Sequence, residues 1–537
     1  MKIKISKLLN PDVYNHPVSK IELIETHISW VILTGDFAYK IKKPVNLGFL
    51  DFSILEKRHE YCEQEVRLNR RLAPDLYLGV VSILGTTDKP IISENTDSKS
   101  IFEYAVKLVQ FPQSAQLDNK LAAGDLGFEH MDSIAQMVAE FHAKTAIADD
   151  SMDYGNNDIV NQPVAENFEL VKEHLAINNY VNKIDALKQW SSSEFKKLKA
   201  VFEQRKQDGF VRECHGDMHL RNLVWLNDKP VAFDCIEFNP ELRWIDVISE
   251  VAFLIMDLQD RQQDQLAHHY LNSYLEKTGD YAGLSVLSFY LCYRAMVRAK
   301  VDALRIEQKG VDKKEQEQQL AEFESYLTLA SRYTKAQKPK LIIMRGLSAS
   351  GKSTVSQRVL ELLGAIRIRS DIERKRLFDK SFNGTDQGRN RGNTDSAIDA
   401  KIYSQQASQQ TYAKLAELAS QIITAGFSVI VDAVFLTYKQ RKAFQNIAKR
   451  LNAPYVILEI SAPIDVLRQR IVARKNDVSD ADLGVLEHQY SNWKALHECE
   501  INAQISVNTE VAVDIQALVN TIKKQALPSS VVDTSCE

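Results

Sequence analysis

Apolar positions in the first part of the chain alternate with the period of a strand and then recur with the period of a helix. Residues 29–33 and 37–41 flank a Thr-Gly-Asp turn, which predicts a β-hairpin. The spacing of apolar residues predicts a helix over 52–72, and a mixed run predicts a strand over 101–111. From residue 131 onward the pattern is mainly helical.

A different pattern begins after a short polar linker at 335–340. Here short apolar runs alternate with amphipathic stretches. Strands are predicted at 341–344, 365–369, 428–432, 455–460 and 505–508, and helices at 354–363, 372–378, 397–425, 466–475 and 514–523. The linker therefore separates two regions with different arrangements of secondary structure.

The polar string at 213–238 contains the residue types that phosphoryl transfer requires. That reaction needs a carboxylate beside the acceptor hydroxyl and two oxygen ligands that hold Mg²⁺ against the nucleotide phosphates. Asp217, Asn222 and Asp234 supply these groups in that order. The alternative, a loop whose polar residues only cap turns, is disfavoured by the complete His-Gly-Asp-x-His-x-x-Asn string.

The spacing within this string supports the same interpretation. Asp217 and Asn222 are five residues apart, as are the catalytic Asp and the metal-binding Asn of a kinase catalytic loop. Apolar runs at 222–226 and 230–233 flank an Asn-Asp turn signal and predict a second hairpin. We expect this hairpin to return Asp234 to the side of Asn222.

The string resembles the signature of the aminoglycoside phosphotransferase and choline kinase-like branch of the protein-kinase fold. The resemblance implies that Asp217 is the catalytic base, that Asn222 and Asp234 bind metal, and that His215 is a structural support. One departure is that Cys-Ile-Glu follows Asp234 where the family has Phe-Gly. Glu237 is therefore an additional metal or substrate ligand, or only a surface carboxylate.

The N-terminal hairpin and the helix after it contain the residues for a nucleotide-phosphate contact. Lys40 is predicted to bind the α- and β-phosphates, and Lys42 on the same strand face is the alternative. Glu65 is predicted to pair with this lysine, with Glu63 as second choice. An edge strand bearing surface lysines is the competing interpretation.

Two further residues of this region are assigned structural roles. Asp246 precedes a helical pattern and is predicted to cap that helix. Members of the resembled family use an Asp here to brace the catalytic loop. His142 lies on the apolar face of a predicted helix, which is typical of a core histidine rather than a ligand.

A predicted helix at 283–307 carries Arg294, Arg298 and Arg305 on one face. Two interpretations stay open. The arginines form salt bridges through Asp302, or they recognise an anionic acceptor, with Arg298 and Arg294 as substrate contacts.

Residues 346–353 form a complete G-x-x-x-x-G-K-S phosphate-binding loop between a predicted strand and a predicted helix. Its glycines allow backbone N–H groups to point at phosphate oxygens. Lys352 is predicted to reach the β- and γ-phosphates, and Ser353 to hold Mg²⁺. The predicted nucleotide-binding residues here are Gly346, Ser348, Ala349, Ser350, Gly351, Lys352, Ser353 and Thr354.

The Ser-Asp-x-x-Arg sequence at 370–374 resembles that of small P-loop kinases of the gluconate kinase-like, zeta toxin-like and polynucleotide kinase-like groups. The resemblance implies that Asp371 is the acceptor-hydroxyl base and Arg374 an acceptor anchor. The alternative is that Asp371 only caps the helix predicted after it.

Three more residues complete the predicted C-terminal site. Asp432 ends an apolar strand, a Walker-B-like position for ordering Mg²⁺-bound water. Arg470 and Arg474 are four residues apart on one helix face and are predicted to clamp phosphate. A pair of solvated surface arginines is an equal alternative.

The whole chain resembles bacterial fusions of an aminoglycoside phosphotransferase-like domain with a P-loop kinase-like ATPase domain. The implied fold class is an α+β, two-lobed protein-kinase-like domain followed by an α/β P-loop NTPase domain with a parallel sheet. We place these domains at 1–335 and 336–527, with a disordered tail at 528–537. The resemblance implies ATP and Mg²⁺ at both sites but does not identify an acceptor.

The composition of the chain indicates its expected cellular location. The net charge of −4 gives no bulk attraction to nucleic acid or anionic membranes, and no apolar run reaches the length of a membrane span. The six cysteines form no CxxC, and the N-terminus lacks the features of a signal peptide. We therefore expect a cytoplasmic protein with reduced thiols.

Three functional hypotheses follow. The first is a bifunctional kinase acting on a hydroxyl of a small, anionic metabolite. The second is a C-terminal nucleic-acid 5′-hydroxyl kinase, prompted by the basic run Arg-Lys-Arg at 374–376. The absence of an interleaved aromatic and basic patch in the sequence weighs against it. The third is an ATP-binding regulator with one non-catalytic domain, which the two complete motif sets disfavour.

Overall fold

The computed structural model describes residues 3–46, 50–94, 100–174, 178–306, 313–378, 404–473 and 482–525. The chain forms two compact units. The first comprises Met1–Ser133, Phe141–Ile177 and Ser192–Asp257, and the second comprises Ile134–Glu140, Asn178–Ser191 and Leu258–Glu537. No helix in the described ranges is both long enough and apolar enough to cross a bilayer.

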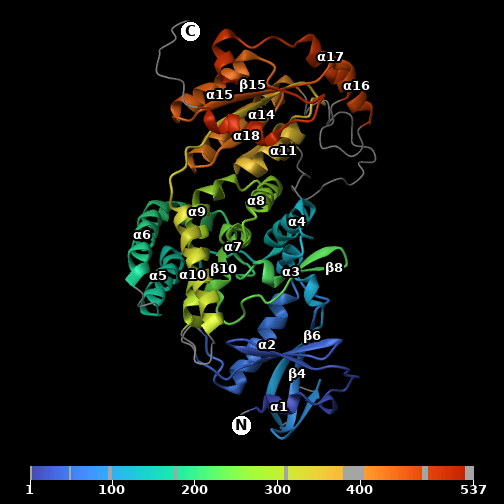
Figure 1. Ribbon diagram of the computed structural model, residues 1–537, viewed down its shortest axis with the longest axis vertical. Helices are drawn as coiled ribbons and strands as arrows, with labels where there is room; N and C mark the ends of the chain where they lie inside the picture. The colour runs from blue at the N-terminus through green and yellow to red at the C-terminus, as the bar shows by residue number, and fades with distance from the viewer. Residues whose placement is uncertain are drawn as a thin grey trace. The chain divides into compact units, whose positions relative to one another are not determined.

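A six-stranded antiparallel sheet, in the order β1-β2-β3-β6-β4-β5, dominates the N-terminal part of the first unit (Figure 1). Its strands are β1 (Glu22–Glu25), β2 (Ser29–Leu33), β3 (Phe37–Lys42), β4 (Tyr77–Thr86), β5 (Lys89–Ser93) and β6 (Ile101–Val109). The predicted hairpin is confirmed, because β2 and β3 pair from Ser29↔Lys42 to Leu33↔Ala38.

The alternation of side chains along β3 separates two apolar clusters. Tyr39 and Ile41 belong to one cluster, whereas Ala38 packs in the other with Cys62 and Val66 of α2 (Leu55–Asn69). Since side chains two residues apart point to the same face, Lys40 and Lys42 lie on the α2 side of the sheet. Because of this alternation, both lysines face α2.

The first unit contains further helices and strands. They are α1 (Ile5–Leu8), α3 (Leu117–Ala122), α5 (Asn157–His174), β7 (Val211–Glu213), β8 (Leu223–Leu226), β9 (Lys229–Ala232) and β10 (Trp244–Asp246). Helices α4 (Phe128–Lys144), α6 (Asn178–Gln207) and α7 (Val247–Asp260) have residues in both units. The predicted second hairpin is confirmed, since β8 pairs with β9 and both turn residues, Asn227 and Asp228, have positive φ.

The second unit contains a five-stranded parallel sheet in the order β12-β13-β11-β14-β15. Its strands are β11 (Leu341–Arg345), β12 (Ile366–Arg369), β13 (Val429–Asp432), β14 (Tyr455–Ser461) and β15 (Gln504–Asn508). The helices that follow them are α11 (Lys352–Leu363), α12 (Ser370–Phe378), α14 (Gln405–Thr424), α15 (Tyr438–Arg450), α16 (Ile464–Ala473), α17 (Leu483–Ser491) and α18 (Ile515–Lys524). Every residue of β11 and β13 is buried, as expected of central parallel strands covered on both faces.

Three helices that precede the predicted linker also belong to the second unit. They are α8 (Asp264–Thr278), α9 (Leu284–Ile306) and α10 (Lys313–Tyr333). The second compact unit thus begins before residue 336. The domain boundary at 335 stays a prediction, and the predicted tail at 528–537 lies outside the described residues.

A buried ion pair in the second unit provides a test of this packing. Arg441 of α15 donates two hydrogen bonds of 2.7 Å to Glu500, and both side chains are 2% exposed. Arg441→Met should lower the free energy of unfolding by about 3–5 kcal/mol, because it leaves a buried carboxylate without its partner. Urea unfolding of the full chain would measure this loss.

Arg468 supplies the matched control, because its ion pairs with Asp465 and Glu487 are solvent-exposed. Arg468→Met should leave the urea midpoint nearly unchanged. Equal losses in the two variants would contradict the role given to burial.

Candidate functional site

Two lysines of β3 and one glutamate of α2 form an ion-pair cluster. Lys40 Nζ lies 2.9 Å from one carboxylate oxygen of Glu65, and Lys42 Nζ lies 2.7 Å from the other. Glu65 is fully buried, whereas the exposed Glu63 lies 3.6 Å from His59. The structure therefore directs Glu65, rather than Glu63, at both candidate phosphate lysines.

Carboxylates from the segment after β9 complete the cluster. Lys40 pairs with Asp234, and Lys42 pairs with Glu237. The side chain of Asp234 is 44% exposed and that of Lys40 13%, whereas those of Lys42 and Glu237 are 1% and 4% exposed. Lys40 and Asp234 therefore face the open side of the cluster, and Glu237 is not a surface carboxylate.

The charges of this cluster stabilise one another. Burial opposes the charged form of Lys40, but Asp234 and Glu65 raise its pKa well above the usual value. Burial likewise opposes ionisation of Glu65, but the two lysines lower its pKa to about 2. Counting Glu237, three carboxylates face two ammonium groups. This excess of negative charge fits a bound Mg²⁺ ion.

Asp217 and Asn222 lie in contact within the loop between β7 and β8. The Asn222 side-chain nitrogen donates to the Asp217 carboxylate at 2.8 Å and to the Asp217 carbonyl at 3.0 Å. The side chain of Asp217 is 34% exposed, so an acceptor hydroxyl can approach it. Because the amide nitrogen of Asn222 is directed at Asp217, the amide oxygen is the atom suited to bind Mg²⁺.

The β8–β9 hairpin brings the third predicted residue to this pair. Phe233 N donates to Asn222 O at 3.0 Å, and Asp234 follows directly. His215 links the two segments, since one ring nitrogen lies 2.9 Å from Phe233 O and the other accepts from Asp217 N at 3.3 Å. Burial lowers the pKa of His215, which favours the neutral ring that these contacts require.

Two residues that the sequence analysis did not single out hold Asp234 in place. Asp234 has φ of 62°, a left-handed conformation that is unfavourable for a residue other than glycine. Its N–H donates to the Tyr77 hydroxyl at 3.0 Å, and the N–H of Cys235 donates to Asn69 Oδ1 at 2.9 Å. No local sequence signal marks Tyr77 or Asn69, because both are more than 150 residues away in the chain.

Acidic residues of α7 brace the loop that contains Asp217. Glu250 accepts a hydrogen bond of 2.6 Å from Gly216 N, and Asp257 accepts one of 2.9 Å from Leu220 N. Both carboxylates are buried. They fix the backbone on either side of Asp217 and were not anticipated from the sequence.

Asp246 directly precedes α7, and its predicted bracing of the catalytic loop stays a prediction. It accepts from Ile248 N at 2.9 Å at the start of α7, as expected of a cap, and pairs with buried Arg205 at 2.6 Å. Glu250 and Asp257 of α7 bond directly to the loop backbone. His142 lies 3.0 Å from Glu250, in agreement with a core histidine that has a hydrogen-bond partner.

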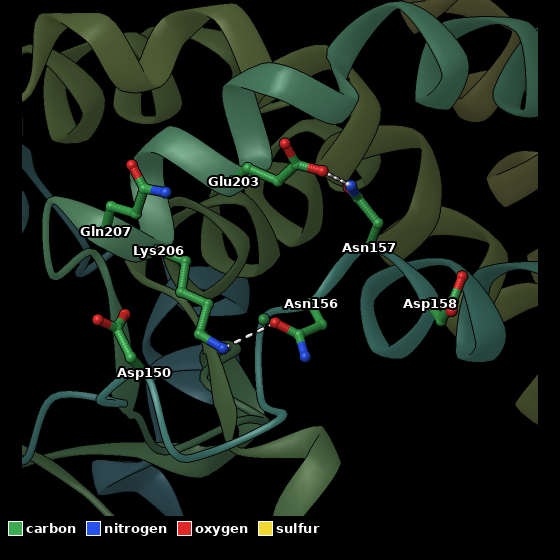
Figure 2. Close-up of a pocket in the computed structure, with 8 residues that line it drawn as sticks. Asp150, Asn156, Asn157, Asp158, Glu203, Lys206 and Gln207 are labelled. Carbon is green, nitrogen blue, oxygen red and sulfur yellow. Dashed lines mark hydrogen bonds between the residues drawn. The ribbon is translucent and has the colours of Figure 1, made fainter.

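A pocket lies in the first unit at the start of α5 and the end of α6, and Figure 2 shows the residues that line it. Its volume is about 360 Å³. Asn157 donates to Glu203 at 2.5 Å, and Lys206 donates to Asn156 Oδ1 at 2.7 Å. Asp150 and Asp158 also line the pocket. None of the residues predicted for catalysis lines it.

In the second unit, the phosphate-binding loop joins β11 to α11. Gly351 has φ of 90° and Ala349 has φ of 63°. A Cβ atom at Gly346 would lie 2.5 Å from Ile460 O, so only glycine fits there. Lys352 Nζ donates to Gly346 O at 2.9 Å and to Leu347 O at 2.8 Å, which places the ammonium group over the loop.

The remaining predicted residues of this loop continue the same turn. Ser348, Ala349 and Ser350 are buried, and Thr354 lies in the first turn of α11. The N–H of Ser348 donates to Gln489 Oε1 of α17 at 2.8 Å. Gln489 was not anticipated, because α17 follows the loop by more than 130 residues.

The predicted Mg²⁺ ligands of the second unit lie in contact. Ser353 Oγ donates to Asp432 Oδ2 at 2.9 Å, and Ser356 Oγ lies 3.3 Å from the same oxygen. A hydroxyl and a carboxylate together suit the hard Mg²⁺ ion. Ser356 is a further member of this group that the sequence analysis did not name.

Arg470 contacts the phosphate-binding loop and is therefore not a solvated surface arginine. Its guanidinium donates to Thr509 O at 2.7 Å and to Ala349 O at 3.3 Å. Thr509 Oγ1 in turn donates to Ser350 O at 2.7 Å. Arg470 thus braces the loop backbone. Arg474 lies outside the described residues.

Asp371 lies in the first turn of α12, because that helix begins at Ser370. It is therefore not the N-cap of this helix. Its carboxylate lies 3.4 Å from Arg374, and its side chain is 28% exposed. Burial raises the pKa of Asp371 despite the nearby Arg374 and Arg369, a direction that suits a proton acceptor near neutral pH.

Two of the three arginines of α9 contact α10, and the third is buried. Arg305 pairs with Glu315 of α10 at 2.6 Å, a partner that the sequence analysis did not identify. Arg298 lies over the ring of Tyr326, 5.8 Å from its centroid, and Arg294 is 4% exposed. The recognition of an anion by Arg294 and Arg298 stays a prediction.

Comparisons with known proteins agree with the two predicted kinds of domain. Residues 129–287 match the profile of the phosphotransferase enzyme family, and residues 341–496 match that of an AAA domain. The chain therefore contains a kinase-like phosphotransferase-family domain followed by a P-loop domain of the AAA type. The predicted fold class is confirmed.

An uncharacterized protein of Mycobacterium tuberculosis is 29% identical over 495 residues, which cover 90% of this chain and 94% of that protein. An uncharacterized protein of Mycobacterium bovis gives the same values. Among solved structures, Plasmodium vivax ethanolamine kinase is 10% identical and has a TM-score of 0.37, covering 60% of this chain and 86% of that chain. A gluconokinase of Sinorhizobium meliloti is 18% identical with a TM-score of 0.25, covering 34% of this chain and 89% of that chain.

Substitution of the two lysines of β3 should separate their roles. Lys42→Met removes the partner of two buried carboxylates and should lower the free energy of unfolding by about 3–5 kcal/mol. Lys40→Met leaves Glu65 paired with Lys42 and should instead weaken nucleotide binding. Urea unfolding would measure the change in stability. Calorimetry with an ATP analogue would measure nucleotide binding, in a Lys352→Ala background so that the C-terminal site does not contribute. A reversed pattern would assign the phosphate contact to Lys42.

Proposed function

We propose that the chain is an ATP- and Mg²⁺-dependent phosphotransferase that phosphorylates a hydroxyl of a small molecule. The observation that carries this proposal is the convergence of three segments in the first unit. The hairpin brings Asp234 beside the Asn222–Asp217 pair, while Lys40 of β3 pairs with Asp234 from the other side. The proposed base, the two proposed metal ligands and the proposed phosphate-binding cation thus come from three segments that meet in the first unit.

Each of these residues has a role in the proposed transfer. Asp217 accepts the proton of the acceptor hydroxyl as the oxygen attacks the γ-phosphorus of ATP, and the bond from that phosphorus to the β–γ bridging oxygen breaks to release ADP. Asn222 and Asp234 would hold Mg²⁺, which supplies positive charge to the phosphate oxygens when bound. Lys40, paired with Asp234 in this structure, would contact the α- and β-phosphates. Glu65 keeps Lys40 oriented, and Glu250 and Asp257 hold the backbone of the catalytic loop.

We further propose a second transfer site in the C-terminal domain. The backbone N–H groups of the loop and Lys352 bind the nucleotide phosphates there, and Ser353 with Asp432 holds Mg²⁺. Asp371 is the proposed base. Its partial exposure and the raised pKa support this assignment. ATP and Mg²⁺ are therefore the proposed cofactors of both sites.

A nucleic-acid 5′-hydroxyl kinase ranks below a small-molecule kinase for this second site. The basic run that prompted that hypothesis is occupied by internal contacts, since Arg374 pairs with Asp371 and Arg376 pairs with Glu373. A regulatory ATP-binding role would need one site to lack a catalytic group. A cytoplasmic location and an anionic acceptor contacted by Arg294 and Arg298 remain predictions.

Replacing the two proposed bases should separate the two activities. Asp217→Asn should lower phosphorylation of the N-terminal acceptor by on the order of 10²-fold or more, while ATP binding stays nearly intact, because the base touches the acceptor. A metabolite phosphorylation screen with the full chain would identify the acceptors. Asp371→Asn is the matched control and should affect only the C-terminal acceptor. Normal turnover in both variants would contradict the assignment.

Nucleotide stoichiometry tests whether both sites bind ATP. Calorimetric titration of the full chain with AMP-PNP and Mg²⁺ should give two sites, and Lys352→Ala should remove one of them. The physical reason is that each unit contains its own phosphate-binding cation and Mg²⁺ ligands. A single site in the unmodified chain would show that one domain has lost nucleotide binding.

A further inference from the structure

Helix α8 packs along one edge of the parallel sheet, although it ends more than sixty residues before the phosphate-binding loop. Strand β12 forms this edge, and Asn272 of α8 pairs with its backbone as a neighbouring strand would. Asn272 Nδ2 donates to Ala365 O at 3.0 Å, and Arg367 N donates to Asn272 Oδ1 at 2.8 Å. Both polar groups of the side-chain amide are thus used at the edge.

The contact continues along α11. One ring nitrogen of His268 lies 2.8 Å from Glu361 O, and His269 lies 3.0 Å from the Glu361 carboxylate. A Cβ atom at Gly364 would lie 2.9 Å from the His268 ring. Helix α8 is therefore closely packed against the two elements that flank the predicted Mg²⁺ ligands.

One carboxylate of α8 pairs with two arginines of β12. Glu276 lies 3.1 Å from Arg369 and 3.5 Å from Arg367, and its side chain is 17% exposed. Its backbone carbonyl accepts a hydrogen bond of 2.6 Å from Arg376 of α12. Glu276 thus connects α8 to the strand and the helix that carry the Asp371 segment.

These two arginines lie beside the Mg²⁺ ligands. Arg369 is the register partner of Asp432 on the adjacent strand β13, and side chains in register on parallel strands point to the same face. Arg367 donates to Ser353 O and to Ser356 Oγ, each at 3.2 Å. Asp432 is therefore a second carboxylate with which the two arginines can pair. In doing so they would compete with a metal ion for Asp432.

We propose that Glu276 is a positioning residue of the C-terminal site, which holds Arg367 and Arg369 and so leaves Asp432 available to Mg²⁺. This inference rests on the proposed function, because it requires Mg²⁺–nucleotide binding at that site. In the unmodified chain, one carboxylate of α8 faces two guanidinium groups. Without that carboxylate, the guanidinium of Arg369 turns to Asp432 and raises the Mg²⁺ concentration that the site needs.

The experiment uses the full chain with Lys40→Met, which weakens nucleotide binding at the N-terminal site, and the binding that Lys352→Ala removes from this chain is assigned to the C-terminal site. AMP-PNP affinity is measured as a function of Mg²⁺ concentration and also in EDTA. Glu276→Gln should raise the Mg²⁺ concentration for half-maximal effect by about two- to fivefold, the size expected for one partly exposed charge interaction. Affinity in EDTA should stay unchanged. The control is Glu361→Gln, which alters another carboxylate of the same contact and should keep the unmodified Mg²⁺ dependence.

The net charge around Asp432 predicts the direction in which the Mg²⁺ requirement changes in two further variants. Arg369→Gln should lower the Mg²⁺ requirement, and Glu276→Gln combined with Arg369→Gln should return it to the unmodified value. A structural defect would not produce this order. If Glu276→Gln fails to fold by circular dichroism, Arg369→Gln alone carries the test.

Two negative outcomes differ in meaning. An unchanged Mg²⁺ dependence in Glu276→Gln and in Arg369→Gln, with normal binding in the parent chain, would overturn the role of Glu276 alone. Absence of Mg²⁺-dependent AMP-PNP binding in the parent chain, unaffected by Lys352→Ala, would overturn the proposed C-terminal site and the role of Glu276 with it.

Discussion

The carboxylate of Glu65 is the interaction on which the N-terminal site depends. It is fully buried and receives one lysine on each oxygen, so it joins β3 to α2. The same lysines then bind Asp234 and Glu237, which follow the β8–β9 hairpin. Buried charged groups of this kind are stable only when each has a partner of opposite charge. A buried group without a partner loses its hydration and gains no ion pair in return.

This dependence explains why the cluster has an inner and an outer pair. Lys42 and Glu237 are almost fully buried and hold the segment after β9 against the sheet. Lys40 and Asp234 lie at the exposed side, where, in the proposed function, phosphates and Mg²⁺ would replace their mutual contact. The inner pair is therefore placed to stabilise the fold, and the outer pair is the one accessible to a ligand.

The C-terminal site depends on backbone geometry more than on ion pairs. Gly346 leaves no room for a side chain, and Arg470 and Thr509 hydrogen-bond to the loop carbonyls. Side-chain charge enters at the edge of the sheet, where Glu276 of α8 faces Arg367 and Arg369. A helix that precedes the linker is thereby part of the surroundings of the second site, so the second unit cannot be reduced to the residues after 336 without removing these contacts.

Local patterns determined a large part of this protein. The hairpins, the phosphate-binding loop and the order Asp217, Asn222, Asp234 follow from strand alternation, turn residues and fixed spacing, all of which act over a few residues. Tertiary structure decided which charges meet. Three outcomes depend on contacts between distant segments. The lysines of β3 pair with Glu65 and not with Glu63, and Arg305 pairs with Glu315. Glu250 and Asp257 hydrogen-bond to the loop that contains Asp217. Such contacts leave no periodic signal, because a buried charge requires only a partner in space and not one at any particular distance along the chain.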